Sequence, residues 1–483
     1  MYPHRLPAGV LLAMCLVTTP ATADYKQNHL CVDGSDTVCS QIPADLDGLE
    51  VRVQGYTPST DRNPNPDTAQ QINFDYFGWQ SFVALNWPAD ASGQPAGDIR
   101  DDTKSPRVWQ FYPGIEQVFP GATVAPDICP DNGRMTVSQT SKLTSSSFIE
   151  PFTPWPLIDQ AGNFVLYDIR VNPRWADYVR AEGLDTRAGQ AAFAAKGGEW
   201  NLPRGTAGDV GAIEIKTAWR LLPEDEAGDD YFTQPINVVV PAGNSPSGQP
   251  LCLQETAALV GMHIMQKVAT PEEFAPFWIW ASFEHARNAP LAAGAPLSQE
   301  NENSPLTDRE PVASCPVPAD AGDGWAFFNP GCTNGGQACA PNAPPEGKQF
   351  VWAEEKPYAA AYLHDGKFGT QVTRCWALYD TGAEVNAQFQ AALTGSVWAQ
   401  YELIGVQWAN DHGDYYAEKM RPFAAPIYMV NTTMETYLQI NPVLDAHGDP
   451  STDRPSSCIM CHNMGRDTAG TKSDFSFLGG YAN

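Results

Sequence analysis

The sequence predicts an α+β protein whose body is mostly antiparallel sheet with a few helices. The chain of 483 residues contains 40 glycines and 42 prolines, which favour turns and short strands over long helices. Strand-length apolar runs recur along it, and it has neither an internal repeat nor the glycine fingerprint of a dinucleotide-binding fold. Because 43% of the residues are hydrophobic, the chain can bury a large core.

The strand-like runs are rich in β-branched and aromatic residues. They cover residues 108–112, 164–169, 213–219, 237–240 and 398–408. Two further runs, 259–265 and 277–285, are separated by turn-like residues and predict a β-hairpin, with a helix as the alternative for the first run. The crowded aromatic segment from Phe74 to Leu85 predicts one amphipathic helix that ends before Pro88.

The chain is expected to divide into four parts. Residues 1–23 have the pattern of a secretory signal: Arg5, then an apolar run, then Ala21-Thr22-Ala23 as a cleavage site. A membrane anchor is the alternative, but neither this run nor any later one reaches the about 18 apolar residues of a membrane span. The mature parts are an N-terminal arm at 24–70, a β-rich body at 71–430 with a disulfide-bridged insertion at about 298–348, and a C-terminal segment at 431–483.

The cysteines indicate an oxidising compartment, so the predicted location is periplasmic or secreted. Of the 11 cysteines, one lies in the signal and two lie in a motif at 458–462, which leaves an even set of eight for four disulfides. The short separations favour the pairs Cys31–Cys39 and Cys332–Cys339. The pairing of the other four stays open; they are Cys129, Cys252, Cys315 and Cys375.

The motif Cys458-Ile459-Met460-Cys461-His462 has the spacing C-x-x-C-H of covalent haem attachment. Cysteines three positions apart on one helical turn can each bond a vinyl group of a haem, and the adjacent histidine can bind the iron as proximal ligand. A structural zinc would require a second pair of Cys or His ligands, and a thioredoxin-like pair would require a βαβ unit. A plain disulfide between the two cysteines would leave His462 without a role. The sequence therefore predicts one covalent haem c and a C-terminal haem-attachment segment.

In this motif the chain resembles the c-type cytochromes. Only 21 residues follow His462, a placement similar to that in cytochrome c′ or cytochrome P460. Cytochrome c′ is a four-helix bundle, whereas this chain is rich in strands, and P460 proteins are β-rich but much shorter. The resemblance is therefore to a large exported monohaem c-type cytochrome. It implies redox chemistry, and we expect a haem oxidoreductase because electron shuttling alone requires a much shorter chain. A non-catalytic electron-transfer cytochrome with both axial sites filled is the alternative.

The residues on the other side of the haem would decide between these functions. His263 has apolar neighbours and is a candidate distal iron ligand, with a core histidine as the alternative. His285 and Arg287 resemble a polar distal pocket, in which histidine acts as acid or base and arginine stabilises negative charge, with a polar strand end as the alternative. In the predicted hairpin, His263 and His285 both face the haem if the register permits. His412 and His447 are weaker candidates in loops.

The formal net charge of −27 bears on partners. Nucleic acid and anionic membranes attract basic surfaces, so we expect neither as a partner. A strongly acidic surface favours encounter with a basic redox partner protein or a cationic small-molecule substrate. We expect the mature chain to contain no transmembrane segment.

Overall fold

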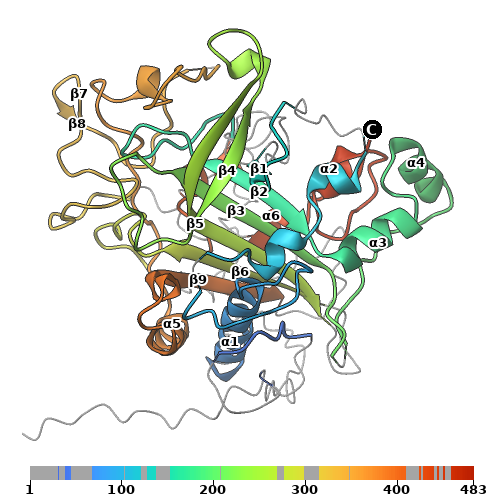
Figure 1. Ribbon diagram of the computed structural model, residues 1–483. Helices are drawn as coiled ribbons and strands as arrows, with labels where there is room; N and C mark the ends of the chain where they lie inside the picture. Colours follow the sequence, from blue (N-terminus) through green and yellow to red (C-terminus); the bar gives the residue numbers. More distant parts are fainter. Residues whose placement is uncertain are drawn as a thin grey trace, which may run out of the picture.

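The structure is a computed structural model. It describes residues 31, 38–44, 68–102, 104–120, 128–137, 153–206, 208–268, 277–298, 315–347, 349–409, 424–425, 428–439, 443–444, 450–451 and 458–483. At its centre lies one 8-stranded sheet, with helices packed outside it (Figure 1). All strand pairs of this sheet are antiparallel except β1 with β4. The α+β class and the mostly antiparallel body are therefore confirmed.

The central sheet has the strand order β1-β4-β5-β6-β9-β10, and β2 pairs with β3, which pairs with β5. Its strands are β1 (Met135–Val137), β2 (Leu166–Val171), β3 (Ile213–Leu221), β4 (Thr233–Val240), β5 (Leu251–Val268), β6 (Phe277–His285), β9 (Tyr401–Ala409) and β10 (Ala424–Ala425). Strand β5 is long enough to pair with β4 along its first half and with β6 along its second half. Two short pairs lie outside the sheet: β7 (Thr333–Asn334) with β8 (Gln337–Ala338), and β11 (Val443–Leu444) with β12 (Pro450–Ser451).

Strands β5 and β6 form the predicted hairpin, whose connecting residues 269–276 lie outside the described residues. His263 lies opposite Ser282, and Met265 lies opposite Trp280. Since directly opposed residues of an antiparallel pair point to the same face, this register assigns a face to each side chain discussed below.

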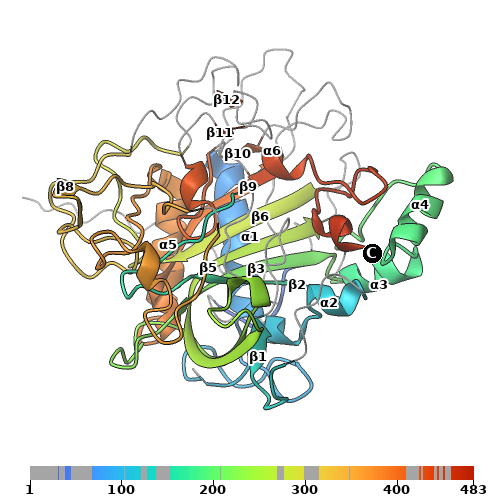
Figure 2. The same cartoon turned by 90° about the horizontal axis from the view of Figure 1, so that it is seen from above.

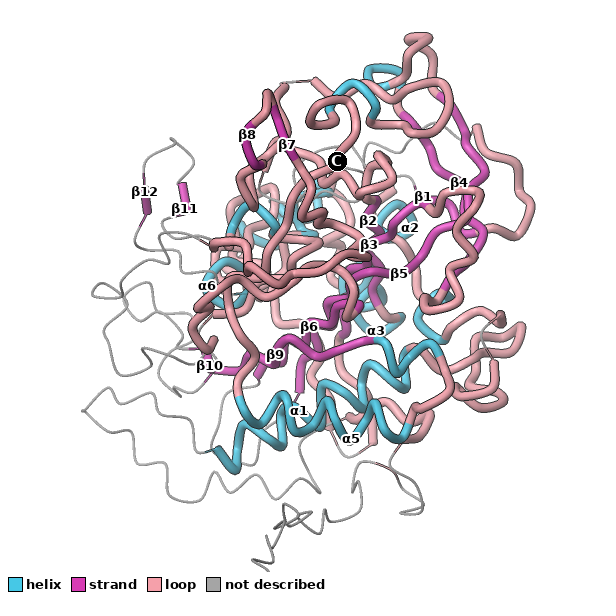
Figure 3. The backbone as a smooth tube through the Cα atoms, turned by 90° about the vertical axis from the view of Figure 1, so that its left-hand side faces the viewer, coloured by secondary structure: helices cyan, strands magenta, loops and turns pink. Residues whose placement is uncertain are grey.

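Helices α1 (Thr68–Leu85) and α5 (Asp380–Ala392) lie side by side along one face of β6 and β9 (Figure 3). Trp79 of α1 stacks on Phe389 of α5 and packs edge-on against Phe283 of β6. A side chain at Gly78 would meet Val406 Cγ2 at 2.6 Å, so glycine permits the close approach of α1 to the sheet. The helix at Phe74–Leu85 is confirmed, but it is not amphipathic, because residues 77–85 are all buried and the helix is covered on every side over this stretch.

The opposite face of β6 and β9 carries C-terminal residues, including helix α6 (Cys458–His462) (Figure 3). The residues after α6 run toward helices α3 (Pro173–Ala181) and α4 (Arg187–Ala195), and the C-terminus lies beside these two helices (Figure 2). There, Gln190 Nε2 donates a hydrogen bond to the carbonyl of Gly479 at 2.8 Å. A short helix, α2 (Ile115–Val118), packs against α3. The last residues of the chain are thus part of the folded body.

One strand prediction is wrong. Residues Val108–Phe111 form a 3-10 helix instead of a strand. The Gln110 side chain accepts a hydrogen bond from the backbone N–H of Arg107 at 2.7 Å, which closes a local turn. Local hydrogen bonding of this kind competes with strand pairing and overrides the β propensity of Val-Trp-Gln-Phe-Tyr.

Four disulfides join the eight cysteines outside the motif: Cys31–Cys39, Cys129–Cys252, Cys315–Cys375 and Cys332–Cys339. The even pairing and both short pairs are confirmed. In the insertion at 298–348, the described residues form turns and the β7–β8 pair, as the composition indicated. Two of the disulfides tie this insertion to itself and to the body.

Candidate functional site

Helix α6 presents the C-x-x-C-H motif as a single helical turn on the sheet. The buried Ile459 anchors it: its backbone N–H donates to Gln407 Oε1 on β9 at 3.2 Å. Cys458 and Cys461 flank this anchor and are partly exposed, and Cys458 Sγ lies 3.9 Å from the carbonyl oxygen of Met429. Residues three positions apart share one side of a helix, so both thiols lie on the same side of α6.

The His462 ring is held in one tautomer. Its Nδ1 lies 2.7 Å from the carbonyl oxygen of Phe475, which can only accept, so Nδ1 carries a proton and donates. Trp280 and Phe477 pack edge-on against the ring at centroid distances of 5.7 and 5.2 Å. Histidine ligands of metals are typically oriented in this way, by a hydrogen bond from the second ring nitrogen.

The donor set fits a covalent haem. Two thiols on one helical turn and an oriented imidazole after them are the groups that attachment requires. The indole N–H of Trp280, beside His462, is buried and has no acceptor among the described residues. A haem would supply acceptors through its propionates. No group of three or more His, Cys, Asp or Glu side chains in the described ranges could hold a metal ion, but haem iron brings its own nitrogen ligands.

His263 lies on the same face of the sheet as the motif. It is opposite Ser282, and two residues farther along β5 lies Met265, which is opposite Trp280. His263 Nε2 is 3.4 Å from Glu435 Oε2, a distance that permits ionic attraction but no well-formed hydrogen bond. Burial would raise the pKa of Glu435, but His263, Lys216 and a backbone N–H together lower the pKa below its ordinary value. Glu435 is therefore an anion beside His263.

His285 does not share this face. It lies two positions after Phe283, which packs on α1, so the two side chains share that face of the sheet. The buried His285 ring stacks on Tyr231 with centroids 3.9 Å apart. Its Nε2 donates to the carbonyl of Asp230 at 2.9 Å, and its Nδ1 accepts from the Arg287 backbone N–H at 3.2 Å. Burial lowers the pKa of His285 to about 4, so the ring is neutral at pH 7.

Arg287 lies just after the end of β6 and contacts other parts of the chain than the motif. Its exposed guanidinium pairs with Asp230 at 3.0 Å and donates to the carbonyl of Gly324 at 3.2 Å. The register expectation that placed His263 and His285 together on the haem face is therefore wrong, because the pairing of His263 with Ser282 puts His285 on the other face. The structure brings the two cysteines, His462 and His263 to one face and leaves His285 and Arg287 apart from them.

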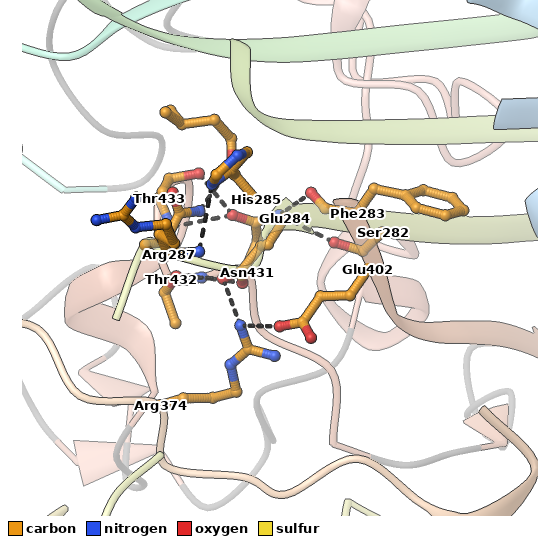
Figure 4. A network of polar contacts seen from close by, with 12 residues as sticks. Ser282, Phe283, Glu284, His285, Arg287, Arg374, Glu402, Asn431, Thr432 and Thr433 are labelled. Carbon is orange, nitrogen blue, oxygen red and sulfur yellow. Dashed lines mark hydrogen bonds and ion pairs between the residues drawn. The ribbon is translucent and has the colours of Figure 1, made fainter. Parts of the chain in front are cut away.

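A polar network that the sequence did not reveal ties residues 428–439 to that same face (Figure 4). Asn431 Nδ2 donates to Ser282 Oγ at 3.1 Å and to the carbonyl of Phe283 at 3.0 Å. The buried Glu284 accepts from the backbone N–H of Thr432 at 2.6 Å and pairs with Arg374 at 3.0 Å. This network holds the segment that carries Glu435. No spacing or motif in the sequence marks Glu435 or the Phe475 carbonyl as part of a site.

His412 and His447 lie outside the described residues, as does the signal at 1–23. In the described part of the chain, no helix combines the length and the apolar composition of a membrane span. No family model matches the chain, and no match was found among curated proteins or solved structures. The function must therefore be argued from the chain's own residues.

Proposed function

We propose that this chain is an exported c-type cytochrome that carries one haem, bound through thioethers at Cys458 and Cys461 and ligated by His462. The observation that supports this most is the 2.7 Å hydrogen bond from His462 Nδ1 to the Phe475 carbonyl. Because Nδ1 is the donor, Nε2 is the nitrogen that would coordinate an iron, and the hydrogen bond would raise the donor strength of the ring. The four disulfides agree with an oxidising compartment, which is where thioether attachment takes place.

We further propose that the protein is a haem oxidoreductase with His263 and Glu435 as its proton-handling pair. A bound haem would supply one-electron chemistry at its iron. The Glu435 carboxylate lies 3.4 Å from His263 Nε2 and can orient the ring, as carboxylates do for general acid–base histidines. In this proposal His285 is a core residue, Arg287 is a surface residue, and neither takes part in catalysis.

The alternative is an electron-transfer cytochrome with both axial positions filled by protein. It has one observation in its favour. His263 lies on the same face of the sheet as the motif, and histidine is a residue type that binds haem iron strongly. The two functions differ in whether the sixth coordination position is open to small ligands.

Mass spectrometry of the denatured protein tests covalent attachment. We expect the mature chain plus one haem, and loss of that mass in a Cys458→Ala, Cys461→Ala variant. A matched control removes another closely spaced cysteine pair, Cys332 and Cys339, and should retain the haem. A wild-type chain without added mass, or one that contains zinc, would overturn the proposal.

Absorption spectra of the ferrous protein with and without carbon monoxide distinguish the two functions. If the sixth coordination position is open, carbon monoxide binds and the absorption spectrum changes promptly. If a protein ligand fills that position, the spectrum stays the same. If His263 is the sixth ligand, His263→Ala should open a closed site. If His263 instead transfers protons, His263→Ala should keep the resting spectrum, and its rate of catalytic turnover should fall about 10²–10⁴-fold. His364→Ala, which changes a loop histidine, is the control and should alter neither.

A further inference from the structure

The carbonyl that accepts from His462 belongs to an unusual backbone segment. Asp474 and Phe475 are consecutive non-glycine residues with φ angles of 51° and 67°, in the left-handed region. L residues adopt this region rarely, and two in succession persist only where the surrounding structure holds them. The orientation of the Phe475 carbonyl therefore depends on contacts outside the segment itself.

Those contacts converge on the Asp474 carboxylate. Lys267 Nζ, at the end of β5, lies 2.5 Å from Asp474 Oδ2, and both side chains are completely buried. The same oxygen accepts from the backbone N–H of Leu202 at 2.7 Å. The other oxygen accepts from the Trp278 indole at 3.1 Å. Three elements of the fold thus hold Asp474, and the next residue supplies the carbonyl to His462.

The burial of this ion pair needs a reason. Desolvation of two charges largely cancels their attraction, so a buried pair contributes little net stability compared with apolar side chains of the same size. Burial lowers the pKa of Lys267, and Asp474 opposes that shift. What the pair does provide is a defined position for Asp474, to which Phe475 is directly joined.

We propose that Lys267 and Asp474 are positioning residues that hold the Phe475 carbonyl against His462 Nδ1 and so set the donor strength of His462 toward a haem iron. The inference rests on the proposed function, since it concerns the reduction potential of the attached haem. A histidine that donates a strong hydrogen bond is a stronger electron donor and favours the ferric state. Loss of the bond favours the ferrous state and raises the potential.

The test is the reduction potential of purified full-length protein in which Lys267→Met and Asp474→Asn are combined, so that no charge is left buried alone. We expect the reduction equilibrium to shift about tenfold toward the ferrous form. For a one-electron couple, a tenfold shift corresponds to a rise of about 59 mV. The matched control combines Lys356→Met with Glu255→Gln, an ion pair near the other end of β5, and should leave the potential unchanged.

The outcomes separate the two claims. Wild-type protein without covalent haem overturns the proposed function and this inference with it. Haem attached in wild type and variant, with equal potentials, overturns the inference alone. If the double variant does not fold, the conservative combination of Lys267→Gln and Asp474→Asn decides by the same measurement, because it nearly keeps the size of both side chains and leaves no charge buried alone. An unchanged potential in that variant also contradicts the inference.

Discussion

Three histidines of this chain show that the partners of the two ring nitrogens, and not burial, decide what the residue can do. In His285 both nitrogens are committed to backbone groups, so the ring is a structural element. In His462 a backbone carbonyl accepts from Nδ1 and fixes the orientation of the ring. His263 Nε2 instead faces the Glu435 carboxylate at 3.4 Å.

The low pKa of His285 makes a pH-dependent contribution to stability. Burial lowers its pKa from 6.5 to about 4 in the folded chain, so between these values the unfolded chain binds the additional proton. The folded state therefore loses stability as the pH falls from 6.5 toward 4. By linkage, this one residue should cost about 2 kcal/mol between pH 7 and pH 5.

Urea unfolding of wild type and His285→Gln at both pH values checks this. The variant is less stable at pH 7, but the pH-dependent loss that His285 contributes should be absent from it. The pH dependence of other groups cancels in the difference between the two proteins. Equal slopes in both would mean that the folded ring titrates normally.

At the scale of elements, strand register determines which side chains can cooperate. The pairing of β5 with β6 gives Trp280, Ser282 and Glu284 to the face that carries the C-terminal residues. The alternate residue Phe283 lies on the face covered by α1. A shift of one residue in this register would exchange the two sets.

The polar network at residues 431–435 should contribute measurably to stability. Asn431→Ala removes two donated hydrogen bonds to β6 and two accepted from Thr433, and we expect a loss of about 2–3 kcal/mol in urea unfolding. Proteolytic cleavage within 428–439 should also become faster in the variant. The surface substitution Thr394→Ala is the control and should change stability by less than about 0.5 kcal/mol. A similarly small effect at Asn431 would show that the network is redundant.

Local signals predicted the elements of the fold, and long-range contacts determined the site. The hairpin, the helix before Pro88 and most strands follow from periodicity and turn residues. The motif at 458–462 was singled out as a candidate because its spacing matches that of covalent haem attachment. Glu435 and the Phe475 carbonyl were not predicted, since nothing local distinguishes them. Glu435 faces His263, which is far away in the sequence, and the Phe475 carbonyl faces His462, 13 residues before it.

At the scale of the whole molecule, the disulfides restrain very different lengths of chain. Cys129–Cys252 spans 123 residues, and Cys332–Cys339 spans 7. Because closure entropy grows with loop length, replacing the long-range pair by alanines should cost about 5 kcal/mol and replacing the short pair about 2 kcal/mol. Urea unfolding of the two double variants measures the difference. Equal losses of stability in the two variants would mean that closure entropy of the unfolded chain does not account for the effect of these disulfides.

The net charge of −27 leads to a prediction about encounter with redox partners. If electrons are exchanged with a basic protein, attraction accelerates the approach at low salt, and added salt screens it. Raising the ionic strength from about 0.01 M to about 0.15 M shortens the screening length from about 30 Å to about 8 Å. The second-order rate of electron transfer measured by stopped flow should then fall about tenfold with a basic acceptor protein.

An acidic acceptor protein of similar size and potential is the matched control for this measurement. Its approach is opposed by repulsion, so its rate should rise over the same range of salt. A rate with the basic acceptor that does not depend on salt would show that the acidic residues lie away from the point of electron exchange. The surface charge would then serve to keep the protein soluble, and a basic partner would have no electrostatic basis.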